Sequence, residues 1–181
     1  FPTGQQRFAE YIRGLQDPVQ SSFHIRRSVE AIVNGGLFGV GIGKGTTKFT
    51  GLPVTHTDSI FAVIAEETGL VGCFMVVGLY IALLWRGLTI ANKAPDMFGK
   101  LLAAGVTLWI TIEALINMGV MVNLIPFAGN ALPLISAGGS SMVMTMGALG
   151  LLMNVARISN IESKNKEGRA YSAVVDLRGR N

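Results

Sequence analysis

The chain has 181 residues, of which 50% are hydrophobic and 14% are charged, and its mean hydropathy is +0.47. Average soluble domains carry about 25% charged residues, so the polar residues here are too few to cover a soluble globule of this size. The formal charge of +4 does not indicate nucleic-acid binding, because the basic residues lie in loops and a tail without a compact basic face or interleaved aromatic residues. The composition therefore predicts a membrane protein.

The N-terminal region, residues 1–67, is expected to be a large loop with short amphipathic helices. The chain begins with Phe1, and its opening segment lacks a charged stretch followed by an apolar one, so we expect no signal peptide and a fragment or processed product. "RFAEYIRGLQDP" has apolar residues at helical spacing, and "SSFHIRRSVEAIVNGG" starts with serines and closes with Gly35 and Gly36. These segments suit helices at a membrane surface and ordinary loop helices equally.

A glycine-rich run, "GGLFGVGIGKGTTK", follows these helices. It fails the phosphate-loop pattern, because Gly45 stands after Lys44 where Ser or Thr is required. Lys44 and Lys48 could still contact a phosphate that does not belong to a nucleotide. A flexible surface turn with two solvated lysines fits these residues equally well.

The densest group of titratable residues lies in "GLPVTHTDSIFAVIAEETG", which contains His56, Asp58, Glu66 and Glu67. Thr57 or Asp58 could cap a helix from Ile60 to Glu67, where a carboxylate stabilises the helix by about 0.3 to 1 kcal/mol. A carboxylate at the edge of a membrane span can also act as a general base. Glu66 and Glu67 could end that helix at the interface or point into a cavity.

Three segments are long and apolar enough to cross a bilayer, at about residues 68–85, 101–125 and 141–156. Lys and Arg are retained in cytoplasmic loops, and here they occupy the connection between the first two spans and the tail after the third. Residues 1–67 are therefore expected outside the membrane, and 157–181 are expected to form a flexible cytoplasmic tail. The lone Cys73 excludes a disulfide framework or a cysteine metal site within the chain.

Two features inside the spans are unusual. Glu113 is an acid within a span, which costs roughly 2.5 to 3.5 kcal/mol on insertion scales, and Asn117 lies one turn later on the same face. Asn117 could hydrogen-bond Glu113 or a neighbouring helix, so structural contact between helices and a direct role both remain open. The uncharged connection "NLIPFAGNALPLISAGGSS" is too apolar for a solvated loop, and we expect it to fold back at membrane depth as the wall of a site for a lipid-linked ligand.

Four motifs in order, "GGLFGVGIGKG", "LPVTHTDSIFAVIAEETGLVG", "EALINMGVMVNLIP" and "LPLISAGGSS", resemble the C-terminal part of the SEDS family, the FtsW, RodA and SpoVE group. The resemblance runs from about Leu15 to Arg157. Family members have ten transmembrane helices. The resemblance implies an all-α polytopic membrane protein in which this chain supplies the last three helices and the large extracytoplasmic loop before them.

The resemblance also implies a function, that of an inverting peptidoglycan glycosyltransferase that polymerises lipid II in the bacterial cytoplasmic membrane, for division or elongation. The family's essential loop aspartate falls on Asp58, which would deprotonate the acceptor hydroxyl. A divalent cation, Mg²⁺ or Mn²⁺, would help the leaving group, and no organic cofactor is expected. Apart from the resemblance, we expect Lys44, Lys48 or Arg27 to bind pyrophosphate by charge. His56, Ser140 and Ser141 are expected to add substrate contacts, and Glu66, Glu67, Glu113 and Asn117 to support the site.

The expected partners are lipid II, a class B penicillin-binding protein and other membrane proteins of the division or elongation machinery. The chain departs from the family pattern at Ala137, Glu113 and Arg27, where Tyr, Gln and Gln are usual. Two other functions remain open: a flippase or transporter for a lipid-linked precursor, which would depend on Glu113 more than on Asp58, and a non-catalytic scaffold that recruits a transpeptidase, which would depend on neither. The 181-residue chain alone is expected to be inactive, because most of the cavity wall would be absent.

Overall fold

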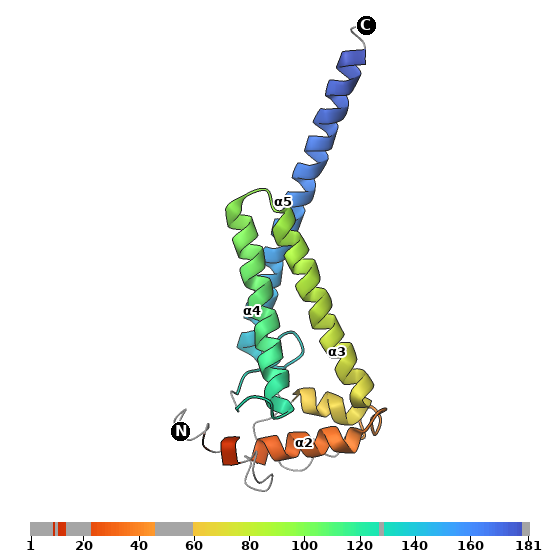
Figure 1. The fold of residues 1–181 in the computed structure, drawn as a ribbon, viewed down its shortest axis with the longest axis vertical. Coiled ribbons are helices and arrows are strands. Elements are labelled where there is room, and N and C mark those ends of the chain that lie inside the picture. The colour runs from red at the N-terminus through yellow and green to blue at the C-terminus, as the bar shows by residue number, and fades with distance from the viewer. Residues whose placement is uncertain (1–8, 10, 14–22, 46–59, 127–128, 179–181) are drawn as a thin grey trace.

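The computed structural model describes residues 9, 11–13, 23–45, 60–126 and 129–178. The described part of the chain contains helices and no strands (Figure 1). The labelled helices are α2 (Phe23–Gly35), α3 (Ile60–Lys93), α4 (Met97–Met121) and α5 (Gly139–Arg178). Those helices that are long and apolar enough to cross a membrane are Ile60–Lys93, Met97–Met121 and Gly139–Asn165. The predicted all-α fold with three membrane spans is therefore confirmed.

Helix α3 is bent at Gly69, whose φ of 67° and ψ of −163° are not helical. Residues 60–68 form a short arm that lies across the end of the bundle beside α2, whereas the remainder of α3 runs along α4 (Figure 1). An L side chain is strained at positive φ, and glycine is not. A single glycine therefore turns the chain between two helical segments of α3.

Helices α3 and α4 form a hairpin that closes tightly at its connection. Asp96 caps α4, and its side chain accepts a hydrogen bond of 2.8 Å from the Gly99 amide. Gly87 of α3 lies against Thr107 of α4, because a Cβ added at Gly87 would be 2.1 Å from the threonine Oγ1. The Thr107 hydroxyl donates to the Ala103 carbonyl, so this buried polar group is satisfied within its own helix.

The helix boundaries differ from the predicted ones. Helix α4 ends at Met121 rather than near residue 125, and α5 continues to Arg178 where a flexible tail was expected from residue 157. The predicted bounds followed apolarity, but helix propensity does not require apolar residues. Residues 157–178 contain no proline and only one glycine, Gly168, so the backbone can stay helical beyond the apolar run (Figure 1).

Two clusters of buried side chains hold the helices together. The larger one joins α2, both parts of α3, α4 and the α4–α5 connection, and its buried members are Ala31, Phe61, Ala62, Val76, Tyr80, Ile110, Ala114, Met118, Val120, Met121 and Leu132. The smaller one joins α3, α4 and α5 near the α3–α4 turn, through Ala91, Ala94, Ala103, Leu152 and Val155. Many other apolar side chains of the spans are exposed, among them Phe74 and Trp85, which suits contact with lipid or with further helices.

Gly69→Ala should destabilise the fold, because alanine is strained at this φ and its Cβ would lie 2.4 Å from the Gly39 amide nitrogen. We expect a loss of roughly 1 to 3 kcal/mol, measured as thermal unfolding of the detergent-purified protein. Gly78→Ala is the matched control, since a Cβ at Gly78 meets no atom within 4 Å. Equal unfolding temperatures for the two variants would contradict the role assigned to the Gly69 bend.

Candidate active site

The glycine-rich segment, residues 36–45, wraps around the bend in α3. Its backbone donates to the arm, from Val40 N to Glu66 O at 3.0 Å and from Gly41 N to Glu67 O at 3.1 Å. In the opposite direction, the amide of Leu70 donates to the Gly36 carbonyl at 3.0 Å. We call α2, residues 36–45 and residues 60–68 together the kink end of the molecule. Its backbone groups are paired where the helix of α3 is interrupted.

Glycines permit this contact, because the two backbones approach more closely than side chains would allow. A Cβ added at Gly39 would lie 2.2 Å from the Glu67 carbonyl oxygen, and one added at Gly35 would lie 2.1 Å from the Ala65 carbonyl oxygen. The part of the run at Gly35 and Gly39 is therefore a packed backbone clamp. Lys44 at its end is exposed, so its proposed contact with a phosphate stays a prediction.

The carboxyl groups of Glu66 and Glu67 lie together behind this clamp. Glu66 is only 1% exposed, and a Cβ added at Gly45 would lie 2.8 Å from its Oε2 and 3.3 Å from Oε1 of Glu67. Both residues make further interactions inside the fold. The helix does not end at this pair, since the bend follows at Gly69, and the two carboxyl groups lie beside Gly45. Two carboxyl groups held this closely offer several oxygen atoms to hydrogen-bond donors, which suits a supporting role at a polar site.

The α4–α5 connection folds back against the spans. Its Pro133 and Leu132 are buried, and the Tyr80 hydroxyl of α3 donates to the Pro133 carbonyl. The Asn117 side chain of α4 donates to the Asn130 carbonyl. Asn117 therefore anchors irregular backbone of the connection, and its predicted contact with Glu113 or a neighbouring helix stays a prediction. Such backbone is tolerated at membrane depth where it is buried in protein, as here.

Tyr80 was missed by the sequence analysis, although a tyrosine in the middle of an apolar span needs a partner for its hydroxyl. Glu113 lies close enough to Tyr80 for the two groups to interact electrostatically, and its side chain is partly buried. Glu113 therefore belongs to the surroundings of the anchored connection. The direct role that the sequence left open for Glu113 stays a prediction.

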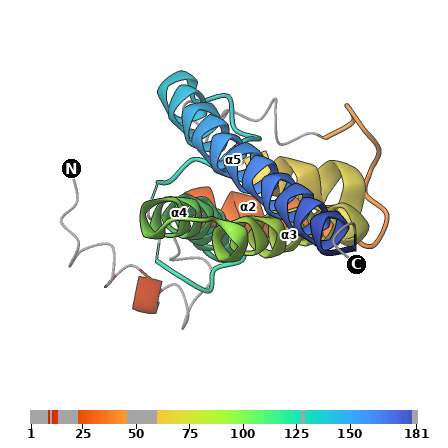
Figure 2. The same ribbon diagram turned by 90° about the horizontal axis from the view of Figure 1, so that it is seen from above.

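Ser140 and Ser141 begin α5 in the first turn. Ser140 is exposed, and the Ser141 carbonyl accepts a 2.7 Å hydrogen bond from the Thr145 hydroxyl. The start of α5 and the 60–68 arm lie apart in both views (Figures 1 and 2). The described part of the chain therefore brings Glu66 and Glu67 together with the clamp but does not bring the two serines to them.

Several predicted site residues lie outside the described part of the chain. Lys48, His56 and Asp58 belong to residues 46–59, which are not described, and the Arg27 side chain is not described either. Their predicted roles stay predictions. Among the described residues there is no group of three or more His, Cys, Asp or Glu side chains that could hold a metal ion. Glu66 and Glu67 offer oxygen ligands of the kind that Mg²⁺ and Mn²⁺ prefer, but two carboxylates alone do not complete such a site.

The fold defines a multi-pass membrane protein with a clamped helix bend at one end and a re-entrant connection between its last two spans. Residues 3–161 match the family model of the FtsW, RodA and SpoVE group, described as "Cell cycle protein". The chain belongs to this family.

Individual relatives agree with this assignment. The chain is 44% identical over 154 residues to stage V sporulation protein E of Bacillus subtilis, covering 85% of this chain and 42% of the relative. It is 46% identical over 159 residues to a probable peptidoglycan glycosyltransferase FtsW of Thioalkalivibrio sulfidiphilus, covering 86% of this chain and 40% of the relative. The chain thus spans less than half the length of these relatives.

Solved structures show the same architecture. One chain of a solved structure described as "Structural coordination of polymerization and crosslinking by a peptidoglycan synthase complex" matches 87% of this chain with a TM-score of 0.66 and 29% identity, over 43% of its own length. A mutant of the rod shape determining protein RodA from Thermus thermophilus matches 71% of this chain with a TM-score of 0.55 and 34% identity, over 40% of its own length.

Tyr80→Phe should loosen the re-entrant connection, because the buried Pro133 carbonyl would lose its donor. We expect a loss of about 1 to 3 kcal/mol in stability, measured by thermal unfolding in detergent. Leu79→Met, at a neighbouring side chain that is 62% exposed, is the control and should leave the transition unchanged. A Tyr80→Phe protein as stable as the control would show that this hydrogen bond does not anchor the connection.

Proposed function

We propose that the full-length protein containing this chain is an inverting peptidoglycan glycosyltransferase that polymerises lipid II into glycan strands. The reaction is suggested by the names of the relatives, which include a probable peptidoglycan glycosyltransferase. The observation that carries the proposal is the clamped kink end. This end contains Gly45 and Ile60, which are the described residues that precede and follow Asp58 in the sequence. The carboxyl groups of Glu66 and Glu67 lie beside Gly45.

Asp58 is proposed as the general base. Its carboxylate takes the proton of the acceptor sugar hydroxyl, and the resulting oxygen attacks the anomeric carbon of the donor. The new glycosidic bond forms as the bond to undecaprenyl pyrophosphate breaks, and attack from the face opposite the leaving group inverts the anomeric centre. A positioned base contributes about 10²- to 10⁴-fold to such a step.

Other residues are proposed to bind the substrate. Lys44, Lys48 and Arg27 would hold the pyrophosphate by charge-assisted hydrogen bonds, and His56 would add a further contact. Ser140 and Ser141 are proposed as substrate contacts from the start of α5. A divalent cation would neutralise charge on the leaving pyrophosphate. Glu66 and Glu67 are proposed as two of its ligands, together with oxygen atoms from other parts of the full-length protein. The steps above do not depend on this cation.

The proposed partner is a class B penicillin-binding protein, whose transpeptidase would crosslink the strands. The matching peptidoglycan synthase complex is described as coordinating polymerisation and crosslinking, which supports this proposal for the present protein. Other division or elongation proteins of the membrane are proposed as further partners.

We also propose that the kink end faces outward from the bacterial cytoplasmic membrane and that the C-terminus is cytoplasmic. A cysteine placed at Ile42, which is 85% exposed, should react with an impermeant maleimide in intact cells, in a protein whose Cys73 is replaced. A cysteine at the exposed Asn92 should react only after the cells are opened. The reverse pattern of labelling would overturn the orientation.

Asp58→Ala and Asp58→Asn should each lower glycan synthesis from labelled lipid II at least roughly a hundredfold, because the acceptor hydroxyl loses its base. The assay uses the purified full-length protein with its transpeptidase partner. Asp96→Asn is the matched control and should leave glycan synthesis unchanged. Asparagine also caps helices, and Asp96 lies at the start of α4, at the end of the bundle opposite the kink end. The 181-residue chain alone should make no glycan, because it spans only about two fifths of its relatives' length.

The same assay separates the competing functions. Glu113→Gln should retain polymerisation, and normal glycan chains from both Asp58 variants would refute the general-base assignment. A lipid-transport assay in proteoliposomes completes the comparison, and loss of transport with Glu113→Gln but not with the Asp58 variants would favour a transporter. Neither glycan synthesis nor lipid transport by the wild-type protein would favour a scaffold.

A further inference from the structure

A hollow of about 340 Å³ lies between α3 and α5, at the end of the bundle opposite the kink end. Its polar lining comes from Arg86, Thr89 and Lys93 of α3 and from Ser159 and Asn160 of α5. We call this end, where α3 finishes and α5 continues past it, the basic end. The hollow is not part of the candidate active site.

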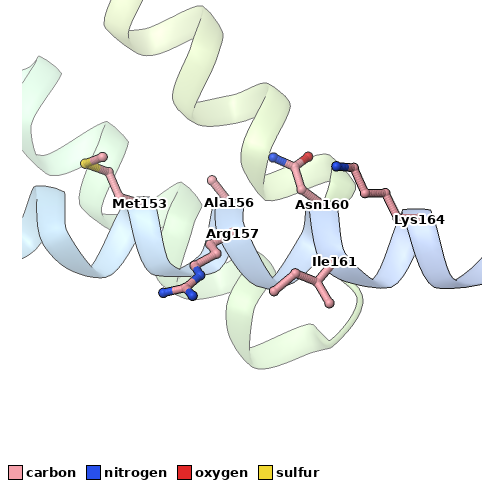
Figure 3. Close-up of a pocket in the computed structure, with 6 residues that line it drawn as sticks. All are labelled: Met153, Ala156, Arg157, Asn160, Ile161 and Lys164. Carbon is pink, nitrogen blue, oxygen red and sulfur yellow. The ribbon is translucent and has the colours of Figure 1, made fainter.

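A second hollow of about 530 Å³ adjoins the first and shares Ala156 and Asn160 with it. It runs along one helix, α5, and adds the basic side chains of Arg157 and Lys164 (Figure 3). Figure 3 shows Lys164 on the same side of α5 as Asn160, next to the neighbouring helix. Together the two hollows collect four basic side chains from two helices.

The described residues that line the two hollows carry charge of one sign, with four basic side chains and no carboxylate. The nearby acids lie outside the lining: the Asp96 carboxylate accepts from the Gly99 amide at the start of α4, and Glu162 is a partly buried residue of α5. The Ser159 hydroxyl donates a 2.6 Å hydrogen bond to the Lys93 carbonyl. This carbonyl belongs to the negative end of the α3 dipole, and the hydrogen bond reduces its repulsion of an anion. The hollow therefore offers donors and positive charge to an anionic group.

Apolar groups continue from the hollow toward the membrane. Ile90 and Ala156 line it, Met153 lines the adjoining hollow, and Trp85 stands 75% exposed one residue before Arg86. Exposed tryptophan is typical of the membrane interface, so the basic side chains lie at headgroup depth. A bound molecule would meet positive charge at one end and apolar surface at the other.

We propose that the basic end binds the phosphate headgroup of an anionic phospholipid in the hollow between α3 and α5. Arg86 and Lys93 bind the phosphate, Asn160 donates to it, and an acyl chain lies along Ile90 and Met153. Basic hollows between spans on the cytoplasmic side suit such headgroups. The inference rests on the membrane placement of the chain and is independent of the proposed glycosyltransferase activity.

Native mass spectrometry of the full-length protein, with added phosphatidylglycerol or phosphatidylcholine, tests this site. Phosphatidylglycerol should bind at least roughly tenfold more tightly than phosphatidylcholine. Arg86→Gln with Lys93→Gln should weaken phosphatidylglycerol binding roughly 25-fold, about fivefold for each lost charge. The charge-retaining pair, Arg86→Lys with Lys93→Arg, should keep most of the binding. It also provides a folded variant should the neutral pair fail to fold.

The matched control is Lys100→Gln with Arg169→Gln, which removes the same charge from exposed positions outside both hollows. Equal weakening by this control would overturn the site in favour of a diffuse surface charge. Three other results would also overturn the proposed site. The first is equal binding of the two lipids, and the second is no bound lipid because another segment fills the hollow. The third is displacement of phosphatidylglycerol by millimolar inorganic phosphate.

Discussion

The fold depends on the contact between two backbones at the kink end, where Gly39 and Gly69 meet without side chains. The amides of the glycine-rich segment donate to carbonyls of the α3 arm, which satisfies polar groups at a helix interruption. The arm can then lie across the bundle, and α2 can pack beneath it (Figure 1). Without this clamp, the bend would expose unpaired backbone at the edge of the apolar region, where unpaired polar groups are costly.

Two polar side chains in the spans satisfy backbone polar groups at another irregular segment, the connection between α4 and α5. Tyr80 and Asn117 each donate to a carbonyl of the connection between α4 and α5, so irregular backbone is held against the helices. The two ends of the molecule differ in their chemistry. The buried Glu66, the partly buried Glu67 and the backbone contacts mark the kink end, whereas exposed basic side chains line the hollows at the other end. This difference matches the different surroundings expected on the two sides of a membrane.

Much of the fold could be predicted because membrane spans are set by length and apolarity. All three predicted spans are present, and the re-entrant character of the α4–α5 connection followed from its lack of charge. The helix ends were predicted less well. Apolarity does not stop a helix, so α5 continues through polar residues to Arg178, and the arm of α3 joins the first span through Gly69. The motif resemblance found the family and proposed Asp58, but spacing could not show that Glu66 and Glu67 sit behind the clamp.

The sequence by itself determined that the chain is an all-helical membrane protein, which family it belongs to, and which segments carry its charged groups. Composition and ordered motifs are local properties and can be read directly along the chain. Only the tertiary structure decided that Gly35 and Gly39 pack against the α3 arm, that Asn117 donates to a carbonyl of the α4–α5 connection, and that Arg86 and Lys93 share a hollow with α5. These depend on contacts between residues far apart in the sequence, which no local pattern specifies.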